Sequence, residues 1–190
     1  MSRCYCQTCL RPMRGCLCSL IRRQTPPFEI GILQHPSEVK QAKGTAHLLH
    51  LCLPNSRLWV GEQIEDLPEL QAWLSAKPTY LLYPDASPGL VTKPAQSLQD
   101  IQVLLLDGTW RKTYKILQLN PQLQALPRIG LQHLPTSRYS IRKAQRDDSL
   151  STFEAGLALI KQLDAMQDYT ELDKVFAEFI QQQQAFLPKI

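Results

Sequence analysis

The sequence predicts an α/β fold in which helices flank a mainly parallel β-sheet, with a small cysteine-rich module at the N-terminus. Three observations predict this. Apolar runs of strand length alternate along the chain with segments of helical periodicity. The runs at 79–83 and 101–106 are apolar on both faces, as expected of central parallel strands covered by helices on each side. Five of the six cysteines, in contrast, lie within the first 18 residues.

The length of 190 residues and the hydrophobic content of 44% suit one domain with a small addition. The segment before Pro26 and Pro27 is too short and too polar to have a core of its own. We therefore expect a zinc-binding module over residues 1–25 and an α/β domain over residues 26–190.

Five elements are predicted in the first half of that domain. Residues 28–33 (FEIGIL) form a buried strand, and the helical spacing of apolar residues predicts a helix over 39–51. A short strand follows at 58–60. Proline suits the first turn of a helix, which places the next helix over 68–74. The strand at 79–83 then follows.

The second half begins with the strand at 101–106 and a helix over 110–119, which an Asn-Pro pair ends. A weak strand is predicted at 128–131. A Ser-Thr-Phe-Glu capping box opens a helix over residues 151 to about 166, and a last helix spans about 172–186.

Charge is unevenly distributed along the chain, although the net charge is only +4. Residues 1–23 contain five arginines and no acid, whereas residues 149–190 contain three lysines against six acids. This asymmetry predicts one surface that faces a polyanion. No apolar run reaches the roughly 18 residues of a membrane span, and the N-terminus lacks the apolar stretch of a signal peptide. We expect a cytoplasmic protein without membrane contact.

The cysteine spacing indicates a metal site. Cys6-x-x-Cys9 and Cys16-x-Cys18 offer four thiolates, the number that a tetrahedral structural zinc requires. Four sulfur ligands leave no open position for a substrate, so the zinc is expected to be structural. Cys4 is a surplus candidate that could replace Cys6. Reduced thiols without a metal, or a redox pair, are the alternatives.

The Asp-Gly-Thr-Trp sequence after the strand at 101–106 is the second candidate site. Asp107 is expected just beyond the carboxyl end of that strand, where ligands bind in open α/β sheets. Gly108 allows a tight turn, Thr109 can cap the next helix, and Trp110 offers a flat face to a base. An N-cap aspartate and a core tryptophan are the structural alternative. Neither a G-x-G-x-x-G sequence nor a Walker loop is present.

This tetrapeptide resembles the Asp-x-Thr-Trp signature of the DTW-domain family. Further blocks resemble those of the family in the same order and together span residues 6 to about 156. They are Cys6-Gln-Thr-Cys9-Leu-Arg11-Pro12 with Cys16-Leu-Cys18, Leu33-Gln-His35-Pro36-x-Glu38, Leu82-Tyr83-Pro84, Asn120-Pro121, Ser140-Ile-Arg142-Lys143 and Leu150-Ser-Thr152-x-Glu154-Ala.

The resemblance implies a tRNA-uridine aminocarboxypropyltransferase that uses S-adenosylmethionine, and a SPOUT-like fold with a C-terminal trefoil knot. The bacterial branch of the family suggests a variable-loop uridine as the target. Asp107 is the candidate base for the uracil N3 proton, with a purely orienting role as the alternative. A SPOUT-like RNA methyltransferase and a non-catalytic zinc-containing RNA-binding module remain competing hypotheses, and a monomer is expected.

Two groups of site residues follow from the resemblance and from the basic stretches. The residues expected around S-adenosylmethionine are Leu33, Gln34, His35, Pro36, Leu82, Tyr83, Pro84, Leu106, Asp107, Gly108, Thr109, Trp110, Ser140, Ile141, Arg142 and Thr152. The residues expected to contact tRNA are Arg11, Arg14, Arg22, Arg23, Arg111, Lys112, Arg142 and Lys143.

Overall fold

Five strands form one parallel sheet in the computed structural model, which describes residues 4–83, 91–132, 137 and 150–186. The order across the sheet is β2-β1-β4-β3-β5, and each neighbouring pair is parallel. The mainly parallel sheet predicted from the sequence is thus confirmed. The strands are β1 (Glu29–Gln34), β2 (Ser56–Val60), β3 (Thr79–Leu82), β4 (Gln102–Asp107) and β5 (Arg128–Ile129).

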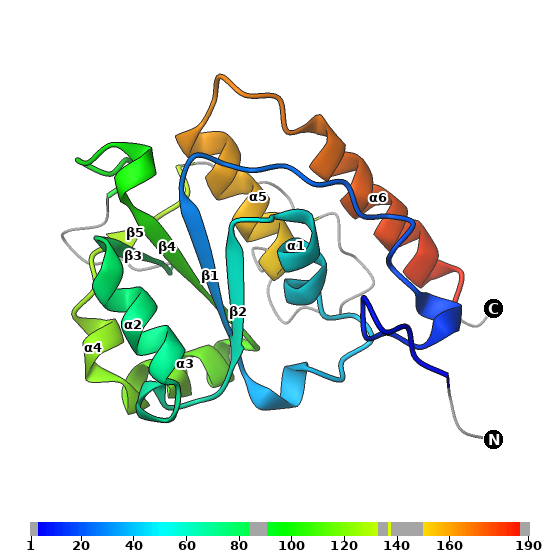
Figure 1. Cartoon of the computed structure of the whole chain (residues 1–190), viewed down its shortest axis with the longest axis horizontal. Coiled ribbons are helices and arrows are strands. Elements are labelled where there is room, and N and C mark those ends of the chain that lie inside the picture. The colour runs from blue at the N-terminus through cyan, green and yellow to red at the C-terminus, as the bar shows by residue number, and fades with distance from the viewer. Residues whose placement is uncertain (1–3, 84–90, 133–136, 138–149, 187–190) are drawn as a thin grey trace.

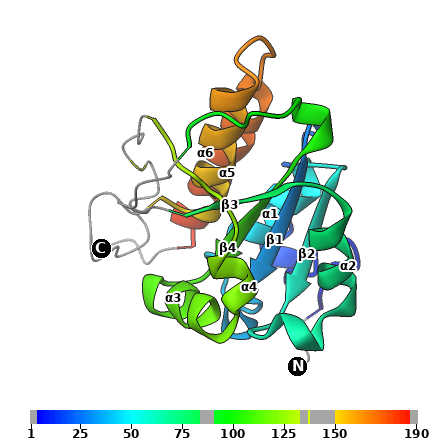
Figure 2. The same ribbon diagram turned by 90° about the vertical axis from the view of Figure 1, so that its left-hand side faces the viewer.

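Helices cover both faces of the sheet, as Figure 1 shows. One face carries α1 (Ala46–Cys52), α5 (Thr152–Leu163) and α6 (Thr170–Gln184). The other carries α2 (Pro68–Ala76), α3 (Trp110–Leu119) and α4 (Pro121–Gln124), and Figure 2 shows α3 and α4 together at one end of that layer. Four short 3-10 helices complete the described elements: η1 (Met13–Gly15), η2 (Pro36–Glu38), η3 (Ile64–Asp66) and η4 (Leu98–Asp100). Within the described ranges, every helix is too short or too polar to cross a membrane.

The two layers have separate cores because successive side chains of the central strands point to opposite faces. Ile30 and Ile32 of β1 join the core under α1, α5 and α6, whereas Leu33 joins the core under α2, α3 and α4. Gly31 lies between them, where a Cβ atom would come within 2.6 Å of the Trp73 ring. This glycine lets Trp73 lie directly against the strand.

Most predicted elements are confirmed to within a few residues, and α3 has the predicted bounds. The helix predicted over 39–51 is wrong in its first half. The chain forms two turns there, directly after η2, and α1 begins only at Ala46. The Gly44 amide donates to the Gln41 carbonyl at 2.9 Å, and the distant Arg11 guanidinium donates to the carbonyl groups of Gln41, Ala42 and Gly44, which stabilises these turns in place of a helix.

Candidate active site and metal centre

Asp107 lies at the carboxyl edge of the sheet as the last residue of β4, with a 6% exposed side chain. Its Oδ2 accepts a hydrogen bond of 2.8 Å from Gln34 Nε2, and its Oδ1 accepts one from the Thr152 hydroxyl. The His35 amide donates to the Asp107 carbonyl at 2.9 Å. The ends of two strands and the start of α5 therefore meet at one carboxylate, whose plane is fixed by donors on both oxygens.

Thr152 reaches Asp107 because of how α5 begins. Ser151 is the N-cap: its hydroxyl accepts from the Glu154 amide at 3.3 Å, and Glu154 Oε2 accepts from the Ser151 amide at 2.8 Å. This confirms the predicted capping box. Ser137 Oγ also donates to both Glu154 oxygens at 3.1 Å. The buried Glu154 thus fixes both the first turn of α5 and the chain at residue 137.

The turn after Asp107 opens α3 as expected, with one difference. Thr109 is the N-cap residue, but its side chain makes no capping hydrogen bond. Its carbonyl instead accepts from the amides of Lys112 at 2.8 Å and Thr113 at 2.9 Å. The structural alternative fails on both counts, since Asp107 is not the N-cap and Trp110 is 45% exposed.

Trp110 stands beside a second aromatic ring from the end of β3. The Tyr83 and Trp110 centroids lie 6.0 Å apart in an edge-on arrangement, and the Arg128 guanidinium lies 5.4 Å from the Tyr83 centroid. Leu33, expected near the cofactor, is fully buried in the core, so only its main chain can meet a ligand. The sequence motifs at 33–36, 82–83 and 106–110 do converge on one edge of the sheet.

His35 is fully engaged in hydrogen bonds. Its Nδ1 accepts from the Ser37 amide at 3.2 Å, which leaves the proton on Nε2, and that atom lies 2.5 Å from Glu62 Oε1. Lys115 pairs with the other oxygen of Glu62, and this hydrogen bond holds the pKa of the Glu62 carboxyl below its usual value. Glu62 was not predicted from the sequence, because it follows β2 in a segment without a motif. His35 therefore serves as a structural link at this edge.

Several basic residues expected to contact tRNA have intramolecular partners. Arg11 donates to three carbonyl groups, Arg22 lies 3.6 Å from Glu178, and Lys112 lies 2.6 Å from Glu38. Arg14, Arg23 and Arg111 are exposed. The assignment of all six to tRNA stays a prediction. Pro84, Ser140, Ile141, Arg142 and Lys143 lie outside the described residues.

The four cysteines of the predicted zinc site come together, with all sulfur atoms within 4.8 Å of one another. Cys6 and Cys18 sulfurs lie 3.5 Å apart, and those of Cys9 and Cys16 lie 3.7 Å apart. Tetrahedral zinc with bonds of about 2.3 Å requires sulfur separations of about 3.8 Å. The site therefore fits zinc. Cys4 is exposed and lies outside this group, which favours Cys6 as the fourth ligand.

Backbone hydrogen bonds favour the thiolate of Cys6, whereas hydrogen bonds to the neighbouring thiols and burial raise the pKa of Cys18. The backbone hydrogen bonds at Cys9 and Thr8 lower the pKa of the Cys6 thiol to about 6. The Leu17 amide lies 3.3 Å from the Cys9 sulfur and donates to it. Metal ligands must be deprotonated, so amide donors around the sulfurs are the surroundings that a zinc site needs.

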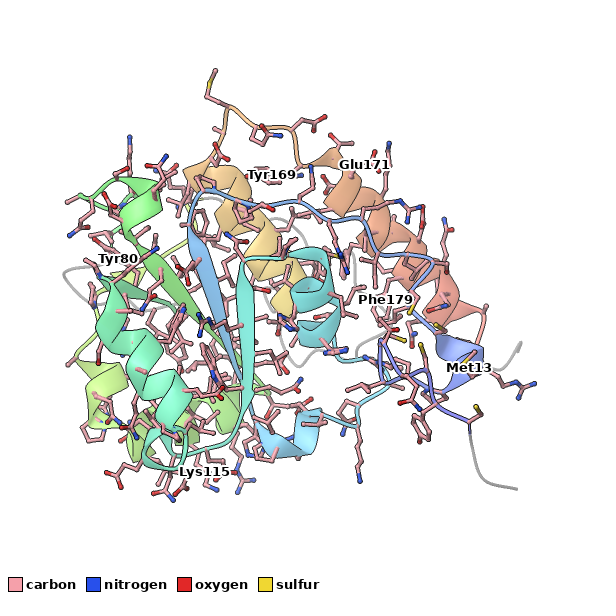
Figure 3. The ribbon with its side chains drawn as sticks, viewed as in Figure 1. Met13, Tyr80, Lys115, Tyr169, Glu171 and Phe179 are labelled. Carbon is pink, nitrogen blue, oxygen red and sulfur yellow. The ribbon has the colours of Figure 1, made fainter. Side chains whose placement is uncertain are left out.

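The cysteine module shares the core of the α/β domain. Cys9, Leu17 and Leu20 belong to the same buried cluster as Phe179 of α6. Gln182 Nε2 also donates to the Cys16 carbonyl at 3.0 Å. Figure 3 shows Met13 of the module close to the end of α6 that carries Phe179. The boundary at residue 25 stays a prediction.

The family model for the DTW domain matches residues 3–184. The chain belongs to the DTW-domain family. The sequence motifs that resemble those of the family therefore reflect membership of it. The motifs within the described residues lie at the carboxyl edge of the sheet and in the cysteine module.

Two curated relatives show moderate similarity to the chain. The chain is 30% identical to tRNA-uridine aminocarboxypropyltransferase 2 of Drosophila melanogaster over 169 residues, which cover 84% of the chain and 66% of that relative. It is 28% identical to the protein of the same name from Macaca fascicularis over 172 residues, covering 81% and 55%. The chain thus spans between about half and two thirds of these relatives. No solved structure matches it.

Proposed function

We propose that this DTW-domain protein transfers the 3-amino-3-carboxypropyl group of S-adenosylmethionine to N3 of a uridine in tRNA, releasing methylthioadenosine. The observation that carries the proposal is the buried Asp107 carboxylate at the carboxyl edge of the parallel sheet, one turn from the exposed Trp110. The names of the two relatives support the reaction class and the tRNA substrate.

The reaction needs in-line attack of uracil N3 on the methylene carbon next to the sulfonium. The N3–C bond forms as the C–S bond breaks, and the N3 proton must leave. Asp107 accepts that proton, while Gln34 and Thr152 hold its carboxylate in a fixed plane. Fixing the acceptor against the reacting atom supplies effective molarity, which is a large part of the rate in displacements of this kind.

The cosubstrate is bound by the segments that follow β1, β3 and β4. The exposed ring of Trp110, supported by the edge of Tyr83, offers a stacking face for adenine or uracil. Main-chain groups of residues 33–36 and 82–83 supply further contacts.

Cys6, Cys9, Cys16 and Cys18 hold a structural Zn²⁺. The metal supplies cross-linking to a segment whose own apolar residues are few, and its four sulfur ligands exclude a role in the transfer step.

We also propose that the protein is a cytoplasmic monomer, that its target is a uridine in the tRNA variable loop, and that the chain has a SPOUT-like fold with a C-terminal trefoil knot. No disulfide joins any of the six cysteines, which suits a reducing compartment. Ser140 and Arg142, which are expected to bind S-adenosylmethionine, lie outside the described residues.

Nucleoside mass spectrometry of tRNA incubated with the protein and S-adenosylmethionine tests the reaction. We expect a uridine that carries the aminocarboxypropyl group, together with stoichiometric methylthioadenosine. A methylated base with S-adenosylhomocysteine would establish a methyltransferase instead. Binding of RNA without any product, and without a calorimetric signal for S-adenosylmethionine, would establish a non-catalytic RNA-binding module.

A further inference from the structure

The loop over residues 35–45 is tied to its neighbours on both sides. On one side the Arg11 guanidinium of the cysteine module donates to the carbonyl groups of Gln41, Ala42 and Gly44, at 2.6 to 3.0 Å. On the other side Glu38 accepts from Lys112 of α3 at 2.6 Å. Figure 1 shows this loop, between β1 and α1, passing beside the N-terminal segment. The module, the loop and α3 therefore form one continuous surface along the carboxyl edge of the sheet.

Within the described residues, the acids on this surface are Glu38, Glu62 and the buried Asp107, and Glu62 is paired with His35 and Lys115. Residues 4–28, residues 39–61 and residues 108–132 contain no Asp or Glu. Glu38, within the loop, is paired with Lys112. Lys40, Lys43, Arg14 and Arg111 are exposed along the same three segments. Because its basic residues are spread over three segments, this edge attracts an anion that is long enough to cross several elements.

Two aromatic side chains stand out from the same edge next to Asp107. Trp110 and Tyr114 lie one turn apart on α3 and are 45% and 58% exposed. Residues four positions apart share a helix face. Exposed aromatic rings among cations are typical of surfaces that stack the unpaired bases of single-stranded RNA. A surface that binds a protein partner typically has a contiguous apolar patch. The exposed residues between these two rings are basic or polar, so the rings do not form such a patch.

We propose that an unpaired strand of the RNA substrate lies along this edge, with one base stacked on Tyr114 beside the uridine held at Asp107. The strand then crosses Lys40 and Lys43, which contact its phosphates, toward Arg14 of the cysteine module. This inference rests on the proposed function for the identity of tRNA as the substrate and for the position of the uridine at Asp107. It adds the path of the strand and three contacts, Tyr114, Lys40 and Lys43, that the family motifs do not include.

Tyr114 is tested by truncation and by a conservative variant. Loss of a stacked base weakens binding about 5- to 150-fold, so Tyr114→Ala should raise the Kd for tRNA within this range, and Tyr114→Phe should restore most of the affinity. The affinity for S-adenosylmethionine, measured by calorimetry, should stay within about two-fold, because the ring makes its contact with RNA. Equal tRNA affinities for Tyr114→Ala and wild type would overturn the stacking assignment.

The two lysines are tested through the salt dependence of binding. The slope of log K against log salt falls by about 0.7 to 0.9 for each phosphate that the protein no longer neutralises, so Lys40→Gln with Lys43→Gln should flatten it by about 1.5. The matched control is Lys93→Gln with Lys174→Gln, two exposed lysines on other elements. Equal slopes for the two double variants would place the strand elsewhere.

Competition with unmodified RNA oligomers of equal length separates this inference from the proposed function. If wild-type protein modifies tRNA and a single strand competes better than a duplex, the path stands. Equal competition by the duplex overturns the single-stranded path while leaving the reaction intact. Absence of tRNA binding by wild-type protein would overturn both.

Discussion

The two polar centres of this chain are built in opposite ways. The four thiols of the cysteine module come from residues 6–18, and only Cys9 of the four is buried. The Asp107 carboxylate is buried and is held by Gln34 and Thr152, which are 73 and 45 residues away in sequence. The first centre is local, and its four thiols could hold a metal ion. The second is long-range and depends on the register of the sheet and on the packing of α5.

A chain of contacts nevertheless joins the two centres. Arg11 donates to the Gly44 carbonyl at 2.7 Å, and Thr45, the next residue, accepts from the Phe153 amide at 3.2 Å through its hydroxyl. Phe153 follows Thr152, the donor to Asp107. A change in the folding or metal content of the module can therefore alter the geometry around Asp107. The two centres are coupled if such a change affects binding or catalysis at Asp107, and independent if it does not.

The largest effect is expected from removal of the metal. Cys9→Ser, or chelation of zinc, removes a bond whose apparent free energy is about 10–16 kcal/mol in small zinc domains, so residues 4–23 should lose their order. Hydrogen exchange should show reduced protection there and at the end of α6, which shares a core with Leu17, while the β-strands stay protected. Cys4→Ser, at an exposed cysteine outside the cluster, is the matched control. Well under one zinc per chain in never-chelated wild-type protein would contradict the metal assignment.

The second prediction concerns the chemistry at the long-range centre. Asp107→Asn should retain the fold and the affinity for S-adenosylmethionine but lose about 10² to 10⁴-fold in single-turnover transfer, roughly 3–5 kcal/mol of transition-state stabilisation. The measurement is made at saturating cosubstrate across a pH series, with the melting temperature beside it. A rate within a few-fold of wild type would exclude Asp107 as the base, and loss of cosubstrate binding would make it a ligand contact.

A smaller effect is expected from the donor on α5. Thr152→Val removes the hydroxyl that donates to Asp107 and leaves a buried carboxylate oxygen with one partner fewer, at a cost of about 1–3 kcal/mol. We expect a lower melting temperature and a lower kcat, with Thr152→Ser restoring both because it retains the hydroxyl. Equal kcat values for the valine variant and wild type would show that the carboxylate needs no such positioning.

The smallest effect tests the connection between the centres. Arg11→Gln should remove the hydrogen bonds to three carbonyl groups, and the loop over 35–45 should show faster hydrogen exchange. If the centres are coupled, KM for S-adenosylmethionine rises a few-fold while zinc content stays at one per chain. Arg14→Gln, which removes an exposed arginine of the same module, is the control. An unchanged KM with a loosened loop would show that the centres are independent.

The sequence was most informative where structure is local. The cluster of four cysteines follows from their spacing, and the bounds of α3 follow from the apolar period and the Asn-Pro pair that ends it. The sequence could group Gln34, Asp107 and Thr152 as residues of one site, but their hydrogen bonds arise only when β1 pairs with β4 and α5 packs against them. The helix expected over 39–51 failed for the same reason, because the contact that replaces its first half comes from Arg11.

The position of β4 has a consequence for how the chain reaches this structure. β1, β2 and β3 all precede β4 in the sequence, yet β4 lies between β1 and β3 in the sheet. During synthesis the first three strands emerge before β4, which pairs with both β1 and β3. Until β4 is made, the edges of β1 and β3 that will face it have no hydrogen-bonding partner. Pairing Gln34 with Asp107 then closes a separation of 73 residues, which is slow because chain entropy decreases before the contacts form. We expect refolding to be limited by insertion of β4, and the candidate active site to be the last part of the sheet to form.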